Sequence, residues 1–110
     1  MNIIKIEVPN KQPAFYFKES ILQKFTKEFI VYILENKGYE KIKIKYFPKY
    51  LHREDGPAIE FSDSNELRYF LGMTNKYYYN GKLVKVYSNE EYLKYVSDMK
   101  FKEKLEEELK

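Results

Sequence analysis

The sequence predicts an α+β fold, in which an antiparallel β-meander of about five to seven strands has one helix packed on it and a second helix at its C-terminal end. Two observations predict it. Turn sequences separate short β-prone runs between positions 50 and 88, and apolar stripes at helical spacing precede and follow that region. With 110 residues, we expect a single domain, 1–110, built around one core.

Two turn motifs organise the central region. The first turn is Asp55-Gly56-Pro57. Aspartate can hydrogen-bond to its own backbone, glycine accepts a positive φ, and proline fixes φ. We therefore expect the chain to reverse there and to enter a strand at the proline. Asn80-Gly81 stands between the β-prone runs 76–79 and 83–87, which is the strongest short-range signal of a hairpin.

The strings LHREDGPAIEFSDSNE and YYYNGKLVKVYSNEEYLKYV carry a resemblance. They are similar to a group of largely uncharacterised bacterial and phage proteins with a tandem HRxDGPA…(W/Y)xxNGK repeat, grouped loosely with MORN-type repeats. The resemblance covers about residues 50–100 and implies an antiparallel meander followed by a helix, with His52 holding the turn. This chain has one HREDGPA and has Ser64-Asn65 where such repeats carry glycine. A single unit cannot stack into a solenoid, and the group implies no activity.

The N-terminal half (1–49) reads as strand, helix and strand. Residues 2–8 alternate between apolar and polar positions, and 14–17 would return as the second strand of a hairpin. A helix is predicted at about 20–37, with a capping box at Ser20 and Gln23 and a stop at Gly38. Its apolar stripe comprises Ile21, Phe25, Phe29 and Ile33, and it is widened by Leu22, Ile30 and Leu34.

A strand is predicted at 41–46, because isoleucine and tyrosine alternate there with Lys41, Lys43 and Lys45. These lysines and Lys49 would form a basic stripe with Tyr50 beside it. Such a stripe could follow a phosphate backbone, with tyrosine available for base stacking. The alternative is an edge strand that lysines protect from unwanted pairing.

Further strands are expected at 59–61 and 67–71, the latter with Arg68 on its outer side. A C-terminal helix is predicted at about 89–108, because Ser88 and Glu91 form a second capping-box pattern. Tyr92, Val96 and Met99 would dock this helix on the sheet. Phe101, Leu105 and Leu109 continue this stripe only after a shift in phase. The tail from about Lys102 would be a projecting or frayed solvated helix, with a partner-binding coil as the alternative.

Catalytic and metal chemistry find little support. The chain has no cysteine and one histidine, His52, which we interpret as a structural turn residue. The sequence has no phosphate-binding glycine loop, dinucleotide motif, serine-hydrolase elbow or HExxH helix. We therefore expect no enzyme activity, no cofactor, no metal and no small-molecule substrate.

The expected function is non-enzymatic binding of a macromolecule, foremost a protein, through tyrosine-rich strand faces. One specific version is a phage- or mobile-element-encoded inhibitor of a host defence nuclease, such as an anti-CRISPR protein, by analogy with the phage repeat proteins. The alternative is a small RNA or single-stranded nucleic-acid binder, and self-assembly is a third class. The candidate binding residues are Lys41, Lys43, Lys45, Lys49, Tyr50, Arg68 and Tyr78, and the structural turn residues are His52, Asp55, Gly56, Pro57, Asn80 and Gly81.

No apolar run approaches the roughly 20 residues that span a bilayer, and the first residues have no pattern of a cleaved leader. We expect a cytoplasmic protein without a membrane partner.

Overall fold

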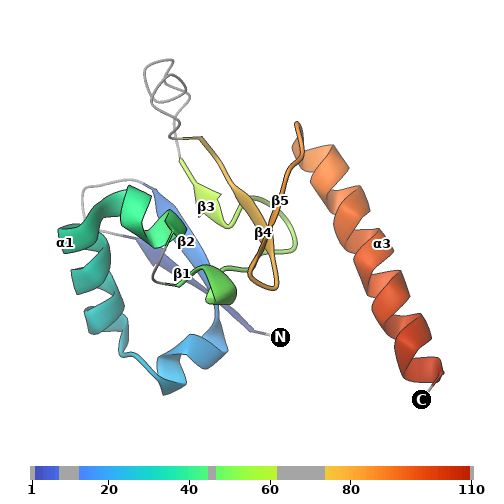
Figure 1. The fold of residues 1–110 in the computed structure, drawn as a ribbon, viewed down its shortest axis with the longest axis horizontal. Coiled ribbons are helices and arrows are strands. Elements are labelled where there is room, and N and C mark those ends of the chain that lie inside the picture. Colours follow the sequence, from blue (N-terminus) through green and yellow to red (C-terminus); the bar gives the residue numbers. More distant parts are fainter. Residues whose placement is uncertain (1, 8–12, 45–46, 62–73, 110) are drawn as a thin grey trace.

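The computed structural model describes residues 2–7, 13–44, 47–61 and 74–109, with the backbone alone at 37–44. Within these residues the chain has the predicted α+β class, with two antiparallel sheets and two α-helices (Figure 1). The elements are β1 (Ile3–Glu7), β2 (Ala14–Lys18), the 3-10 helix η1 (Glu19–Gln23), α1 (Lys27–Ile44), the 3-10 helix η2 (Pro48–Tyr50), β3 (Ile59–Glu60), β4 (Tyr77–Tyr79), β5 (Lys82–Val84) and α3 (Asn89–Glu108).

The strand count is lower than predicted. In the described residues one sheet has the order β1-β2-β3 and the other pairs β4 with β5, so neither reaches the predicted meander of about five to seven strands. The expected strand at 67–71, which includes Arg68, lies outside the described residues.

The N-terminal hairpin agrees with the predicted alternation. β1 and β2 pair antiparallel, with Ile4 opposite Phe17 and Ile6 opposite Phe15. Ile6, Phe15 and Phe17 are almost fully buried, whereas Lys5 is exposed on the other face. The strict period of two therefore sets which face of this hairpin meets the core.

The first helix begins later than predicted. Residues Glu19 to Gln23 form η1, and its N-cap residue is Lys18, whose side chain makes no capping hydrogen bond. The predicted capping box at Ser20 and Gln23 is therefore wrong. The helix α1 starts at Lys27, where the Thr26 hydroxyl oxygen accepts a hydrogen bond of 3.2 Å from the Phe29 amide. A threonine cap followed by an acidic residue in the first turn is a helix-start signal that outweighs the Ser20 pattern.

The buried face of α1 covers only part of the predicted stripe. Ile30 and Leu34, from its wider part, are buried against the first sheet, whereas Phe29 is 43% exposed. Phe25 and Ile33 are partly buried against the same cluster. The helical period of 3.6 applies only from Lys27 on, so the part of the stripe before it does not continue the helical face.

The predicted strand at 41–46 is wrong, because α1 continues through Gly38 to Ile44, and residues 45–46 lie outside the described part. A glycine inside a helix costs only about 1 kcal/mol relative to alanine, and lysine and glutamate favour helix. Positions two apart on a helix lie about 200° apart around its axis, so Lys41 and Lys43 are not successive members of one strand face. The predicted basic stripe therefore has no strand face on which Lys41 and Lys43 would align.

The Asn80-Gly81 hairpin is confirmed. β4 and β5 pair antiparallel on either side of it, and both turn residues have positive φ, 49° for Asn80 and 81° for Gly81. This is the pattern of a type I′ turn, which matches the twist of the flanking strands. A Cβ atom on Gly81 would lie 2.6 Å from the Lys49 Cα atom, so glycine is required both by φ and by the close approach of η2.

The C-terminal helix is confirmed over Asn89–Glu108. The Ser88 hydroxyl oxygen accepts from the Glu91 amide at 3.2 Å, and a Glu91 carboxylate oxygen accepts from the Tyr87 amide at the same distance. Tyr92 and Val96 are buried against Tyr79 and Val84 of the second sheet. Beyond them α3 extends away from both sheets (Figure 1).

Two apolar clusters therefore hold the fold. The larger lies between the first sheet and α1, and the smaller lies between the β4–β5 hairpin and α3. No helix in the described ranges is both long enough and apolar enough to cross a bilayer.

Candidate functional site

The segment 51–53 joins the two motifs that the sequence singled out. Leu51 forms a bridge with Phe17 of β2, and the His52 amide donates to the Tyr16 carbonyl at 3.0 Å. On the other side the Leu51 carbonyl accepts from the Gly81 amide at 2.9 Å. The start of HREDGPA thus connects the first sheet to the turn of YYYNGK.

The His52 side chain completes this connection. Its Nδ1 atom accepts a hydrogen bond of 2.8 Å from the Asn80 amide, and its ring meets the Tyr79 ring edge-on at 4.9 Å. The imidazole is 1% exposed, and this burial lowers its pKa. Since Nδ1 is an acceptor, the neutral ring carries its proton on Nε2, 3.6 Å from a Glu54 oxygen. In this geometry His52 acts as a structural acceptor that holds the hairpin turn.

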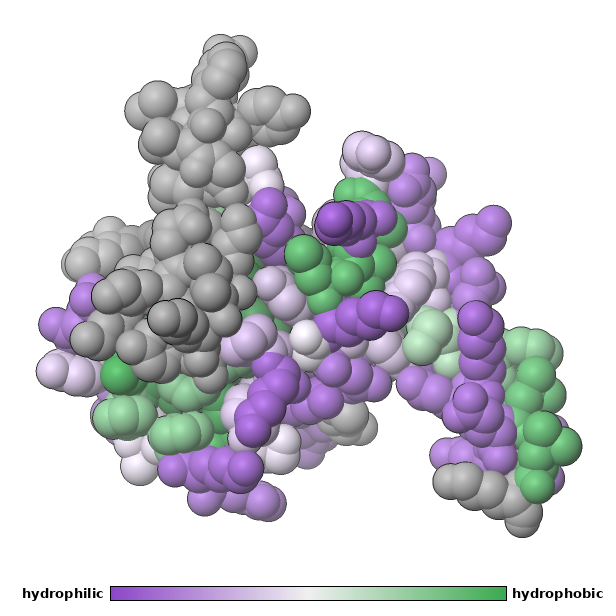
Figure 2. Space-filling view, in the orientation of Figure 1, coloured by the Kyte–Doolittle hydropathy of each residue, from purple (hydrophilic) through white to green (hydrophobic). Residues whose placement is uncertain are grey.

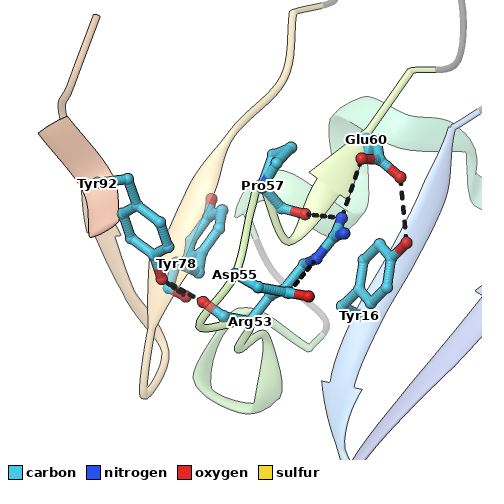
Figure 3. Close-up of polar contacts among 7 residues, drawn as sticks. All are labelled: Tyr16, Arg53, Asp55, Pro57, Glu60, Tyr78 and Tyr92. Carbon is cyan, nitrogen blue, oxygen red and sulfur yellow. Dashed lines mark hydrogen bonds and ion pairs between the residues drawn. The ribbon is translucent and has the colours of Figure 1, made fainter. Parts of the chain in front are cut away.

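Arg53 makes the second connection, between the turn after it and the first sheet (Figure 3). Its guanidinium donates to Asp55 Oδ1 at 2.7 Å, to the Pro57 carbonyl at 3.2 Å and to Glu60 Oε2 at 3.0 Å. It also lies 4.0 Å from the centre of the Tyr16 ring, and the Tyr16 hydroxyl donates to Glu60 at 3.1 Å. The hydrogen bond from Arg53 lowers the pKa of Asp55.

The role of Gly56 differs from the predicted one. Gly56 does not adopt a positive φ. Instead, a Cβ atom there would lie 3.0 Å from the Arg53 Cζ atom, so the absence of a side chain makes room for the guanidinium. The glycine of HREDGPA therefore leaves space for the arginine side chain of the same motif.

Tyr92 connects α3 to the segment 51–53 and to β4. Its fully buried hydroxyl donates toward the carbonyl oxygens of Arg53 and Tyr78, and burial raises its pKa. Lys100, two turns further along α3, forms an ion pair of 2.9 Å with Glu54. These contacts place the helix beside the hairpin and leave its C-terminal part beyond them.

The predicted binding residues whose side chains the structure describes do not all lie on one surface. Lys41 and Lys43 lie on the last turns of α1, while Lys45 and Arg68 lie outside the described residues. Tyr78 is 4% exposed and belongs to the core, so the prediction that it contacts a partner is wrong. Tyr79 is equally buried, in the cluster with α3, so both faces of the tyrosine-rich strand β4 are covered.

Lys49 and Tyr50 do come together, with a third residue that the sequence did not suggest. The Nζ atoms of Lys24 and Lys49 lie 5.7 and 5.1 Å from the centre of the Tyr50 ring. Lys24, and then Lys49, lower the pKa of the Tyr50 hydroxyl. We call Lys24, Lys49 and Tyr50 the basic cluster.

A surface of a different kind runs along the projecting part of α3. Phe101, Leu105 and Leu109 recur at four-residue spacing and are 64%, 43% and 86% exposed. Positions four apart lie about 40° apart on a helix, so the three side chains form one stripe. This apolar stripe lies on the side of α3 away from Tyr92 and Val96, and Figure 2 shows apolar surface along the outer edge of that helix end.

Comparison with protein-family models, curated proteins and solved structures finds no match. The resemblance to the HRxDGPA repeat proteins therefore stays a prediction. Among the described residues there is no group of three or more His, Asp or Glu side chains that could hold a metal ion.

Proposed function

We propose that this protein is a non-enzymatic binding module whose partner is a protein, and that the apolar stripe of α3 is the surface it presents. The observation that supports this is the stripe itself: Phe101, Leu105 and Leu109 are exposed at four-residue spacing on a helix whose opposite face is already docked. Scattered apolar residues need no explanation, whereas an aligned set on one helical face is typical of helix-mediated recognition.

The energetics favour a partner that covers this stripe. Fully burying a leucine or phenylalanine side chain yields about 1.5–3 kcal/mol. Met99 is the last apolar residue of α3 that packs on the second sheet. Glu103 still accepts a hydrogen bond of 3.1 Å from the Tyr79 hydroxyl, so Phe101 lies beside this contact on another face of α3, and Leu105 and Leu109 lie beyond it. A rigid helix also loses little conformational freedom when it binds, which favours association.

The finer version, an inhibitor that occupies the surface of a host defence nuclease, belongs to this proposal. It is supported by the small size of the chain and by its resemblance to phage repeat proteins. Its test is a cleavage assay with purified effector nucleases, with and without this protein. Inhibition that disappears with the stripe variant described below would support it.

The proposal is tested by affinity capture of proteins from a lysate of the source cell. The tagged protein is compared with a variant in which Phe101→Ser and Leu105→Ser remove the stripe. The matched control carries Tyr32→Ser and Tyr87→Ser, which remove two exposed aromatic side chains elsewhere, 58% and 99% exposed. We expect the unaltered protein and the control to retain the same proteins, and the stripe variant to lose them. Equal retention by all three would refute the proposal.

A second candidate function, binding of RNA or single-stranded DNA, is favoured by the basic cluster. Two ammonium groups beside a partly buried tyrosine ring provide phosphate contacts and a stacking surface in one place. Fluorescence anisotropy with short oligonucleotides at two salt concentrations tests this function. Salt-sensitive binding that falls with Lys24→Gln and Lys49→Gln supports it, and flat curves at low salt exclude it.

A further inference from the structure

The geometry points to a second copy of this chain as the partner of the apolar stripe, packed antiparallel along α3. This inference rests on the proposed function, because it names the occupant of the same surface. The charges beside the stripe carry the argument, since they determine which orientation of two such helices is attractive.

The stripe and the charges beside it are free to meet a partner. Every residue from Lys100 to Leu109 is exposed. In the part of the chain that the structure describes, no ion pair involves Lys102, Lys104, Glu106 or Glu108.

These four charges flank the stripe in two pairs. Lys102 and Glu106 lie four residues apart on one side of it, and Lys104 and Glu108 lie four residues apart on the other, as steps of about 100° per residue place them. Each flank therefore has a cation toward the start of the helix and an anion toward its end.

In an antiparallel pair each flank faces the same flank of the other copy, running in the opposite direction. Lys102 then meets Glu106 of the second copy, Lys104 meets Glu108 of the second copy, and each contact occurs twice by symmetry. Leu105 packs on Leu105 at the centre. Each flank thus has two contacts between opposite charges, against one between like charges: Glu106 with Glu106 on one flank, and Lys104 with Lys104 on the other.

In a parallel pair the opposite flanks meet at the same height. Lys102 would lie beside Lys104, and Glu106 beside Glu108. Each side of the contact would then have two contacts between like charges, against one between opposite charges, Glu106 with Lys104. The charge pattern thus favours one orientation and disfavours the other. The contact is short, about 12 Å along the helix, so the dimer is expected to be in exchange with monomer rather than permanent.

The test is sedimentation velocity of the purified full chain over about a hundredfold range of concentration. We expect a monomer of 13.4 kDa at the low end and a dimer at the high end. The Phe101→Ser and Leu105→Ser variant should remain monomeric. Reversing both cations, with Lys102→Glu and Lys104→Glu, should raise the dimer dissociation constant at least about tenfold.

Mixing that acidic variant with one carrying Glu106→Lys and Glu108→Lys should restore dimers, because each variant then supplies the charge the other lacks. Circular dichroism of each variant checks that the fold is kept. Orientation is read from cysteine pairs, since the chain has no native cysteine. A Lys102→Cys chain should form a disulfide with a Glu106→Cys chain faster than with itself.

A monomer at every concentration, or dimers that tolerate loss of the stripe or of its charges, would overturn the inference. If the unaltered protein stays monomeric but captures another protein through the stripe, the inference fails and the proposed function stands. If neither dimer nor capture depends on the stripe, both fail.

Discussion

Replacing His52 with leucine tests whether the two sequence motifs form one structural unit. The change removes the acceptor of the Asn80 amide and leaves that donor without its partner, at a cost of about 1–3 kcal/mol. It also removes the edge-on contact with Tyr79, worth about 0.5–1.5 kcal/mol. We therefore expect a loss of about 2–4 kcal/mol in the free energy of unfolding, from a total of about 5–15.

The assay is urea denaturation followed by circular dichroism at pH 7.5, where His52 is neutral in both states. Two controls separate the contributions. His52→Asn keeps an acceptor atom bonded to Cγ, as Nδ1 is, so it should be less destabilising than His52→Leu. Glu54→Gln removes a 41% exposed carboxylate near Nε2 together with its exposed ion pair to Lys100, and should cost less than about 1 kcal/mol. A loss below about 0.5 kcal/mol for His52→Leu would refute the assigned role.

Three further predictions concern the turn, the histidine and the first helix. Gly81→Ala should destabilise the fold by about 2 kcal/mol or more, because position 81 has a positive φ and the backbone of η2 lies close to it. Asn80→Gly should be nearly neutral, and denaturant midpoints measure both changes. Because burial lowers the pKa of His52, the unfolded chain binds this proton more readily, so thermal stability should be level above pH 6.5 and decline as the pH falls below it; His52→Leu should lose this decline. Ile30→Ala should cost about 2–5 kcal/mol in the free energy of unfolding, and Phe29→Ala clearly less, because Ile30 is fully buried and Phe29 is 43% exposed.

Each of these has an outcome that would count against it. Unchanged stability of Gly81→Ala would discredit the close approach of η2. If His52→Leu loses as much thermal stability on acidification as the unaltered protein, the decline must come from other titrating groups. Equal costs at positions 29 and 30 would show that the orientation of α1 is wrong.

Local chemistry explains what could be predicted from the sequence. The Asn80-Gly81 turn, the Ser88 cap and the alternation in β1 are each determined by neighbouring residues, and all three are confirmed. The extent of α1 was missed because the alternation at 41–46 favours a strand, whereas its lysines also favour helix, and because one glycine interrupts a helix at small cost.

The rest of the site depended on contacts between distant segments. The inward orientation of Tyr78 and the wrapping of Arg53 over Gly56 become visible only once the two motifs are docked. Lys24 could not be linked to Tyr50 because 26 positions separate them in the sequence. The apolar stripe was different. Its four-residue spacing, out of phase with the stripe of Tyr92 and Val96, is visible in the sequence, but only the docked face of α3 shows that it points outward.

The most direct test of the central claim, that the stripe of α3 is a protein-binding surface, is site-specific photo-crosslinking in living cells. Photoreactive benzoylphenylalanine is placed at Phe101, in the stripe, and at Tyr87, an equally aromatic and 99% exposed position outside it. We expect discrete protein adducts from position 101, including a dimer-sized species, and none of these from position 87. No adducts from position 101, or the same adducts from both positions, would contradict it.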